Sequence, residues 1–193
     1  MSKKKLTIAA LILALVLLIG GVVAFFTDQK DASNVFTLGD VEITLTEPSW
    51  VATNGQNMSP GKTVAKDPTI TNTGSMPAYV FAEVKVPMTT ETTPREVFTY
   101  TLNSGWVEVG TGTTADGVTT HVYAYGTASA MTSLAAAAAT PAVFSSVTLN
   151  SAIADPSTIT LDGNDQFKLD IKAKAIQAND LGVTAPADVY ALF

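Results

Sequence analysis

The sequence feature that most constrains this fold is a strict alternation of apolar and polar residues close to the C-terminus. Between residues 166 and 175, every odd-numbered residue is apolar and every even-numbered residue is polar or charged. A period of two puts successive side chains on opposite faces of a β-strand, so one face is apolar and the other is charged. Such a strand is typical of an antiparallel sheet with one face on the core and the other in water.

Strand signals recur along most of the chain after residue 24. Residues 25–193 hold 27 threonines together with frequent Val and Ile, and β-branched residues favour strands. Alternating or β-branched runs between turn residues predict further strands at 41–46, 69–72, 78–87, 98–102, 106–109, 118–125, 143–149 and 157–161. Turn residues at 73–77 predict that 69–72 and 78–87 form a hairpin, and Asp116-Gly117 predicts another turn before 118–125. The predicted fold is all-β: an antiparallel β-sandwich, jelly-roll-like, with one or two short helices in its loops.

Two segments interrupt the β pattern. Residues 128–142 include five consecutive alanines, Ala135 to Ala139, and alanine is the best helix former. A short helix is therefore predicted there, with a mobile low-complexity loop as the alternative. In residues 184–193, Pro186 fits the first turn of a helix, but the same residues also fit a final strand.

The first 26 residues have a composition of their own. Lysines at positions 3–5 precede an apolar run from Leu6 to Phe26. These are the parts of a secretory signal, and small-x-small spacing at its end predicts cleavage between Ala24 and Phe25. A run of 21 residues is also long enough to remain as a membrane anchor. Both alternatives place the chain from Asp28 onward outside the cell, with residues 6–26 as its only contact with the membrane.

Composition excludes several function classes. After residue 24, the chain has eight basic and 17 acidic residues, so its net charge there is −9. That acidity argues against binding to nucleic acid, which requires a basic surface. The absence of cysteine excludes disulfides, thiolate metal sites and a cysteine nucleophile. No cofactor is predicted.

The residues that carry catalytic chemistry in other proteins are sparse here. His121 is the single histidine, which excludes the two-histidine zinc motifs of many metalloproteases. Because it lies on the predicted strand 118–125, we interpret it as a sheet-surface residue rather than as a member of a catalytic triad. Asp162 and Asp165 are weak candidates for calcium ligands, and a polar β-turn explains them without metal. The chain is therefore predicted not to be an enzyme.

Aromatic residues allow two interpretations, a carbohydrate-stacking platform and ordinary core packing. Core packing is predicted for most of them. They are Trp50, Tyr100, Trp106, Tyr123 and Tyr125.

Motifs near the N-terminus resemble a known family. The stretches Gly20 to Asp28 and Asn34 to Ile43 are similar to the leader and mature start of the TasA/camelysin family of Gram-positive bacteria. The similarity continues through residues 60–64, 70–75 and 77–80, and it returns at 173–178. The resemblance implies a SipW-type signal peptide and a secreted jelly-roll sandwich. It further implies a structural role in biofilm-matrix or cell-surface fibres.

The resemblance also implies how such fibres assemble. In them the N-terminal segment of one subunit inserts as a strand into its neighbour, which is a form of β-augmentation. The implied organisation is a signal peptide at 1–24, a donor strand at 25–38 and a β-sandwich domain at 39–193. The implied assembly residues are Phe25, Phe26, Val35, Phe36 and Leu38. The alternative is that residues 26–38 fold back as the first strand of their own domain.

The expected partners are further copies of this chain, the signal peptidase and other matrix proteins, and the expected location is the extracellular matrix or cell surface. Two alternative functions remain at this level. One is a camelysin-like cell-surface metalloprotease, because some members of the family are classified in that way. The other is a monomeric surface adhesin or binding module.

Overall fold

Antiparallel β-strands dominate the structure, which is a computed structural model describing residues 38–160 and 167–193. In this part of the chain the strands are β1 (Ile43–Thr46), β2 (Thr63–Ala65), β3 (Thr69–Asn72), β4 (Ala78–Pro87), β5 (Phe98–Thr99), β6 (Trp106–Glu108), β7 (Thr113–Ala115), β8 (Val118–Tyr125), β9 (Ser146–Leu149) and β10 (Asp170–Gln177). The helical elements are the 3₁₀ turns η1 (Ala52–Gly55) and η2 (Pro156–Thr158) and the short α-helix α2 (Pro186–Tyr190). The predicted all-β fold is confirmed.

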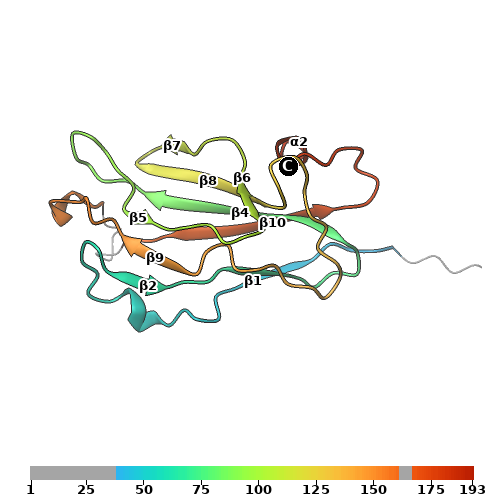
Figure 1. Ribbon diagram of the computed structural model, residues 1–193, viewed down its shortest axis with the longest axis horizontal. Coiled ribbons are helices and arrows are strands. Elements are labelled where there is room, and N and C mark those ends of the chain that lie inside the picture. The colour runs from blue at the N-terminus through green and yellow to red at the C-terminus, as the bar shows by residue number, and fades with distance from the viewer. Residues whose placement is uncertain (1–37, 161–166) are drawn as a thin grey trace, which may run out of the picture. The chain divides into compact units, whose positions relative to one another are not determined.

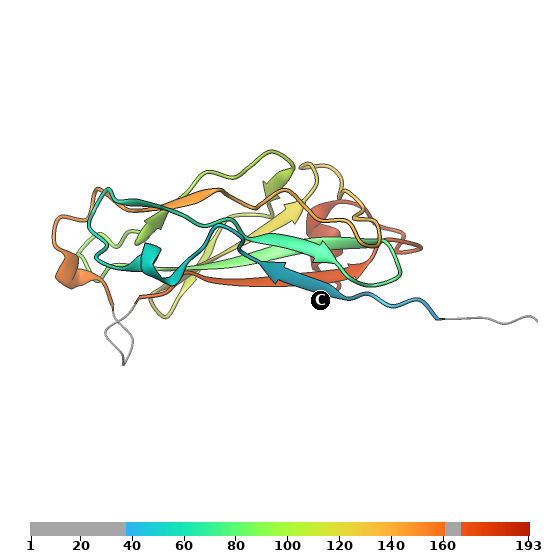
Figure 2. The ribbon, with the colours of Figure 1, turned by 90° about the horizontal axis from the view of Figure 1, so that it is seen from below.

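The strands form two packed layers (Figures 1 and 2). The large sheet has the order β10-β4-β8-β6, with β7 also paired to β8, and the small sheet has the order β2-β9-β5. A separate pair, β1 with β3, lies beside the large sheet, where β1 contacts β10. The last strand thus lies between β1 and β4, and β9 lies between β2 and β5. This interleaving of early and late strands is consistent with the antiparallel β-sandwich that the sequence predicted.

The main core fills the space between the sheets. Phe144, Ile70 and Leu149 are among its largest fully buried side chains, and the ring of Phe144 lies 4.5 Å from that of Tyr100. Burial of this kind is the dominant favourable term in folding. Four of the five aromatic residues considered for core packing belong to this core, Trp106 and Tyr123 as buried members and Tyr100 and Tyr125 as half-buried ones. Core packing is confirmed for these four.

A second, smaller core covers the outer face of the large sheet. Tyr79 and Phe81 of β4 point to this side, where Val189 of α2 and Met131 pack on them. Burial on both faces explains why β4 is a nearly continuous apolar run rather than an alternation. The C-terminal residues therefore form a helix and not a strand.

One charged cluster fastens α2 to this outer face. Lys174 lies 2.5 Å from Glu83, and the hydroxyl of Tyr190 donates to the same carboxylate. The ammonium of Lys174 also lies 4.9 Å above the ring of Tyr190. Burial acts to raise the pKa of Glu83, but these two partners outweigh it and hold the pKa below its ordinary value. The carboxylate is thus the ionised anchor of the helix.

The predicted hairpin between residues 69–72 and 78–87 is wrong. β3 pairs with β1, whereas β4 pairs with β8 and β10 in the large sheet. The fully buried side chain of Asn72 organises the connection. Its amide donates to the carbonyls of Met76 (2.8 Å) and Leu134 (3.0 Å), and its carbonyl accepts from the backbone of Gly74 (3.0 Å). These bonds replace the hairpin ladder, so the chain leaves one sheet and enters the other.

Asn72→Ala is expected to destabilise the fold by about 2–3 kcal/mol, because the substitution leaves buried backbone groups without partners. Chemical denaturation followed by circular dichroism measures this difference. The matched control is Asn179→Ala, at an exposed position, which should change stability by less than about 0.5 kcal/mol. Equal stability of the two variants would contradict the role assigned to Asn72.

The helix predicted for residues 128–142 is also wrong, and the segment is an irregular extended chain. Leu134 exchanges two backbone hydrogen bonds with Ala78, at 3.0 and 2.8 Å, and Ala137 donates to the carbonyl of Asn72 at 2.9 Å. Met131 and Leu134 are buried. Because five alanines bring little apolar surface of their own, pairing with β3 and β4 outweighs their helix propensity.

Other boundaries differ from the predictions in smaller ways. The strand predicted at 157–161 is instead η2, capped by the Asp155 carboxylate, with Ile159 making a single bridge to Thr89. The strands predicted at 98–102 and 143–149 shorten to β5 and β9, and the alternating strand shifts to β10. Asp116 and Gly117 have φ values of 50° and 74° and link β7 to β8. Two positive φ values define the type I′ turn that Asp-Gly favours.

Candidate functional site

Most of the predicted site residues lie outside the described residues. These are Ala24, Phe25, Phe26, Val35, Phe36, Asp162 and Asp165, as well as the apolar run 6–26. Leu38 is described, and its side chain is fully exposed. Among the described residues, the candidate sites are therefore surfaces that can receive an extended segment and clusters of polar side chains.

A groove opens along one edge of the sandwich, where the two sheets end. β2 is the outer strand of the small sheet, and β10 is the last hydrogen-bonded strand of the large sheet, with β1 in contact with it. Residues 50–58 and the start of β10 flank the groove, which has a volume of about 710 Å³. An edge strand carries a row of backbone N–H and C=O groups that its own sheet does not use. The groove therefore combines a cavity with the edge strand β2 of the small sheet.

Apolar side chains form part of the floor and walls of the groove, and polar residues such as Gln56, Lys66 and Asp170 line the rest. The rings of Phe98 and Phe167 have centroids 5.5 Å apart, and Val147 lies with them in the main core. Four partly buried lining residues pack against the main core, and they are Met58, Val64, Phe167 and Leu169. An extended chain that placed alternate apolar side chains here would bury them together with these four.

Fixed polar contacts hold one wall of the groove in place. The Lys62 ammonium donates to the carbonyls of Gln56 (2.6 Å) and Asn57 (3.2 Å), which follow η1. The Lys66 ammonium lies 2.7 Å from the Glu47 carboxylate and 4.8 Å from the centre of the Trp50 ring. Trp50 therefore belongs to the groove rather than to the core. Such contacts prepare the wall before any ligand binds.

A second feature fixes the point at which the N-terminal segment joins the domain. Asp40 accepts from the backbone N–H of Ser75 at 3.0 Å and from its hydroxyl at 2.5 Å, while the Ser75 hydroxyl accepts from the Asp40 N–H at 3.0 Å. The Ser75 hydrogen bonds lower the pKa of the Asp40 carboxyl. Residue 40 is thus anchored to the β3–β4 connection.

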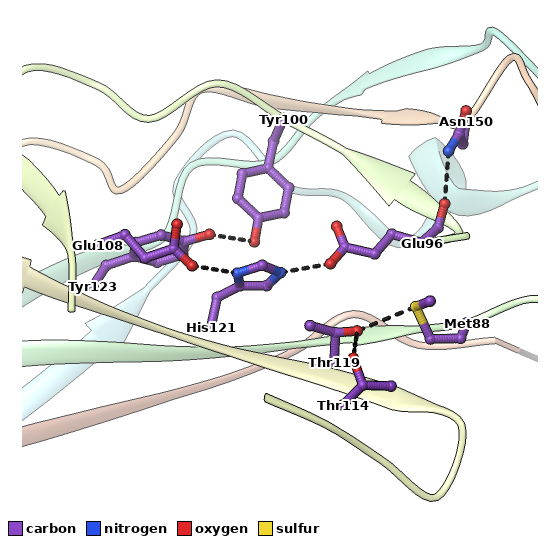
Figure 3. Close-up of polar contacts among 9 residues, drawn as sticks. All are labelled: Met88, Glu96, Tyr100, Glu108, Thr114, Thr119, His121, Tyr123 and Asn150. Carbon is purple, nitrogen blue, oxygen red and sulfur yellow. Dashed lines mark hydrogen bonds and ion pairs between the residues drawn. The ribbon is translucent and has the colours of Figure 1, made fainter. Parts of the chain in front are cut away.

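His121 belongs to a polar cluster inside the sandwich edge, which corrects its interpretation as a sheet-surface residue. Its Nδ1 lies 2.6 Å from Glu108, and its Nε2 lies 2.6 Å from Glu96 (Figure 3). The imidazole is only 15 % exposed, and it stacks on Tyr123, a member of the main core. Strand periodicity placed His121 and Tyr123 on one face correctly. No local pattern shows that this face points inward, because both faces of β8 carry apolar residues.

Neither metal ligation nor membrane crossing finds support in the part of the chain that is described. Both ring nitrogens of His121 already bind carboxylates, and no three His, Asp or Glu side chains of residues 38–160 and 167–193 converge as metal ligands do. In the same residues, no helix has the length and apolar character needed to cross a membrane.

Comparison with known proteins agrees with the motifs at the N-terminus. A search of curated proteins finds no significant match. A comparison with models of protein families matches residues 1–99, slightly more than half of the chain, to the family described as camelysin metallo-endopeptidase. The matched region includes the apolar run 6–26, the Asp40 anchor and the wall of the groove formed by residues 50–58. The chain therefore belongs to the camelysin family, which includes TasA, as its N-terminal motifs predicted.

Proposed function

We propose that this protein is a structural subunit of the cell surface or extracellular matrix that assembles into fibres. In this proposal residues 25–38 of one copy enter the groove of the next copy as an added strand. The observation that carries the proposal is the groove itself, which lies beside the edge strand β2 and has partly buried apolar side chains in its lining. Membership of the camelysin family supports a location at the cell surface.

The chemistry of the segment matches the groove. Residues 25–38 contain apolar side chains at both ends and polar ones between. At about 3.3 Å per residue, the segment can extend over roughly 45 Å, which exceeds the length of any strand in the domain. Edge-strand hydrogen bonds would supply affinity, and the apolar side chains would supply register.

The position of the Asp40 anchor favours donation to another copy over folding back. β10 runs from Asp170, at the groove, to Gln177, which pairs with Ala78 beside the anchor. Eight residues of strand separate the two ends by about 23 Å. Asp40 therefore lies at the end of β10 opposite the groove, so residues 25–38 could fill the groove of their own copy only if the chain reversed before Asp40. A head-to-tail contact needs no reversal, and repeated contacts of this kind build an open filament.

The description of the family implies a metal-dependent peptidase, and the described residues do not fit such a centre. A catalytic zinc uses three protein ligands with a free lone pair on each imidazole. The single histidine here has both nitrogens bound to glutamates, and no converging set of three ligands exists among residues 38–160 and 167–193. We therefore derive no peptidase mechanism for this chain. Casein hydrolysis by the purified protein, abolished by a chelator, would contradict this view.

The proposal predicts that two apolar residues of the donor segment control assembly. The double variant Val35→Ser/Phe36→Ser is expected to abolish fibres, because it removes side chains that would fill the groove. Negative-stain microscopy and sedimentation measure fibre content, and the intact mass of the exported protein establishes its first residue. The matched control, Gln29→Ser/Lys30→Ser, changes polar residues of the same segment and should retain fibres. Wild-type fibres from the Val35/Phe36 variant, or a wild-type protein that stays monomeric at all concentrations, would refute the proposal.

A further inference from the structure

The environment of His121 defines the protonation state of its ring. Each ring nitrogen lies 2.6 Å from a different carboxylate, that of Glu96 on one side and that of Glu108 on the other (Figure 3). An ionised carboxylate can only accept hydrogen bonds. Both ring nitrogens must therefore carry protons to satisfy both contacts at once, and the ring that does so is a positively charged imidazolium. Two charge-assisted hydrogen bonds then hold it in place.

These three residues come from different parts of the sandwich. His121 belongs to β8, and Glu108 ends β6, both in the large sheet. Glu96 lies in the connection that crosses from β4 to β5 of the small sheet, where its carbonyl accepts from the Asn150 side chain at 2.8 Å. The imidazolium consequently links β8, a central strand of the large sheet, to β6 at the edge of that sheet. It also links β8 to the connection that crosses to the small sheet.

The same ring occupies an interruption in the outer strand. β6 and β7 both pair with β8, and residues 110–112 between them interrupt the pairing. A Cβ atom at Gly112 would lie 2.7 Å from Cε1 of His121, so a side chain at this position would collide with the ring. Position 112 therefore favours glycine, and the ring and the interruption fit together as one local structure.

Among the described residues that contact the imidazole ring, Glu96 and Glu108 are the charged ones. Tyr123 stacks on the imidazole, with ring planes 4° apart, and its hydroxyl pairs with that of Tyr100 at 2.9 Å. From β4, the residue opposite His121 is the fully buried Val84. Burial raises the pKa of Tyr123 to about 12 and raises that of Tyr100 further, so both phenols are neutral below that range. The cluster is one cation between two anions in an otherwise uncharged setting.

We propose that His121 is an ionic staple that closes this edge of the sandwich in its protonated form, and that its deprotonation releases the edge. Loss of one proton removes a donor, so one of the two glutamates loses its hydrogen bond. Two carboxylates then remain around a neutral ring. The interrupted outer strand and the crossover to the small sheet are the elements set free. This pH switch is independent of the groove and of fibre assembly.

The direction in which pH changes the stability of the fold follows from the raised pKa of His121. Burial acts to lower the pKa of His121, but the hydrogen bonds and charges of Glu108 and Glu96 outweigh burial and raise the pKa above its ordinary value of 6.5. A raised pKa in the folded state stabilises the fold fully below the unfolded pKa, and this stabilisation is lost as pH rises through the folded pKa. The staple therefore holds in mild acid and weakens on the alkaline side of neutrality.

Proton NMR can test the staple directly, because His121 is the only histidine in the chain. The Cε1 proton of the intact purified protein should titrate with a midpoint above 6.5. Glu96→Gln and Glu108→Gln should each lower that midpoint, since each removes one anionic acceptor. The matched control Glu42→Gln, at an exposed position of the same chain, should leave it unchanged. A wild-type midpoint at or below 6.5, or a midpoint unchanged in both glutamine variants, would overturn the proposal.

Thermal unfolding supplies a second readout. Between about pH 6 and about pH 9, the melting temperature of the wild-type protein should fall relative to that of His121→Gln. The expected fall is about 3–5 °C for each pH unit by which folding raises the pKa of His121. The glutamine variant carries no titrating ring, so it serves as the reference for all other ionisations. Parallel pH profiles of the two proteins would overturn the switch. If His121→Gln does not fold, the same comparison with Glu108→Gln decides, because that variant should show a weaker pH dependence than wild type.

Discussion

Replacing Leu169 with lysine is expected to abolish fibre formation while the domain remains folded. Leu169 lines the groove and is only partly buried, so a lysine can keep its aliphatic stem on the core and its ammonium in water. Once the apolar side chains of a donor strand cover the groove, that ammonium loses its contact with water. Burial of an unpaired charge costs several kcal/mol.

The size of this effect decides whether fibres survive. A loss of about 3 kcal/mol at one contact weakens association by more than about 100-fold. Because every junction in a head-to-tail fibre uses the same groove, the concentration needed for assembly rises by the same factor. Sedimentation across a concentration series measures that factor, and circular dichroism verifies that the variant has folded.

The chain offers a matched control for the Leu169 variant. Leu192 is about half exposed, and it lies in the C-terminal residues outside the groove lining. Leu192→Lys makes the same chemical change and should assemble as wild type does. Fibres formed by Leu169→Lys at the wild-type concentration would remove the groove from the assembly mechanism. Loss of fibres in both variants would show that added charge, rather than its place, is what matters.

The second large effect is expected at the centre of the main core. Phe144→Ala should lower the free energy of unfolding by about 3–5 kcal/mol, because it removes a fully buried ring and leaves a cavity against Tyr100. Domains of ordinary size have only about 5–15 kcal/mol of stability in total. The melting temperature should therefore fall by roughly 10 °C, as measured by calorimetry.

Two variants separate burial from other effects of the Phe144 substitution. Phe144→Leu retains most of the apolar volume and should cost much less than the alanine variant. Phe193→Ala removes the same ring at a half-exposed position and should also cost less. If Phe193→Ala destabilised as much as Phe144→Ala, the main core would not be the principal source of stability.

The strands that were predicted best are those whose limits are signalled by local chemistry. β8 is found within the predicted limits, and Asp116-Gly117 forms the predicted turn before it. Both depend on local chemistry: β-branched residues favour extended backbone, and Asp-Gly tolerates positive φ. The alternation of residues 166–175 likewise identified the apolar face of β10 correctly. Ile171, Ala173 and Ala175 on this face pack on the main core.

The predictions that failed required knowledge of distant partners. The turn at 73–77 has hairpin chemistry, but Asn72 binds Leu134, 62 residues away, and the chain changes sheets. The alanine run has helical chemistry, yet β3 and β4 supply its backbone partners. No local sequence pattern predicts pairings between residues so far apart in the chain.

For the candidate sites too, local motifs were recognised in the sequence, whereas groupings of distant residues were not. The N-terminal motifs alone identify the family, and the match to the family model over residues 1–99 confirms it. The groove was not predicted, because its walls come from residues 50–66, Phe98, Val147 and 167–170. The cluster around His121 was missed for the same reason, since Glu96 and Glu108 lie 25 and 13 residues away.

The sequence by itself determined that this protein is an acidic, cysteine-free β-sandwich of the camelysin family, because strand periodicity, composition and N-terminal motifs are local properties of a chain. Only the tertiary structure decided where the groove lies and which charged side chains surround His121. The physical reason is that strand pairing and side-chain burial bring together residues that no local interaction links. At its single histidine, that pairing turned an expected surface residue into a half-buried ring held between two glutamates.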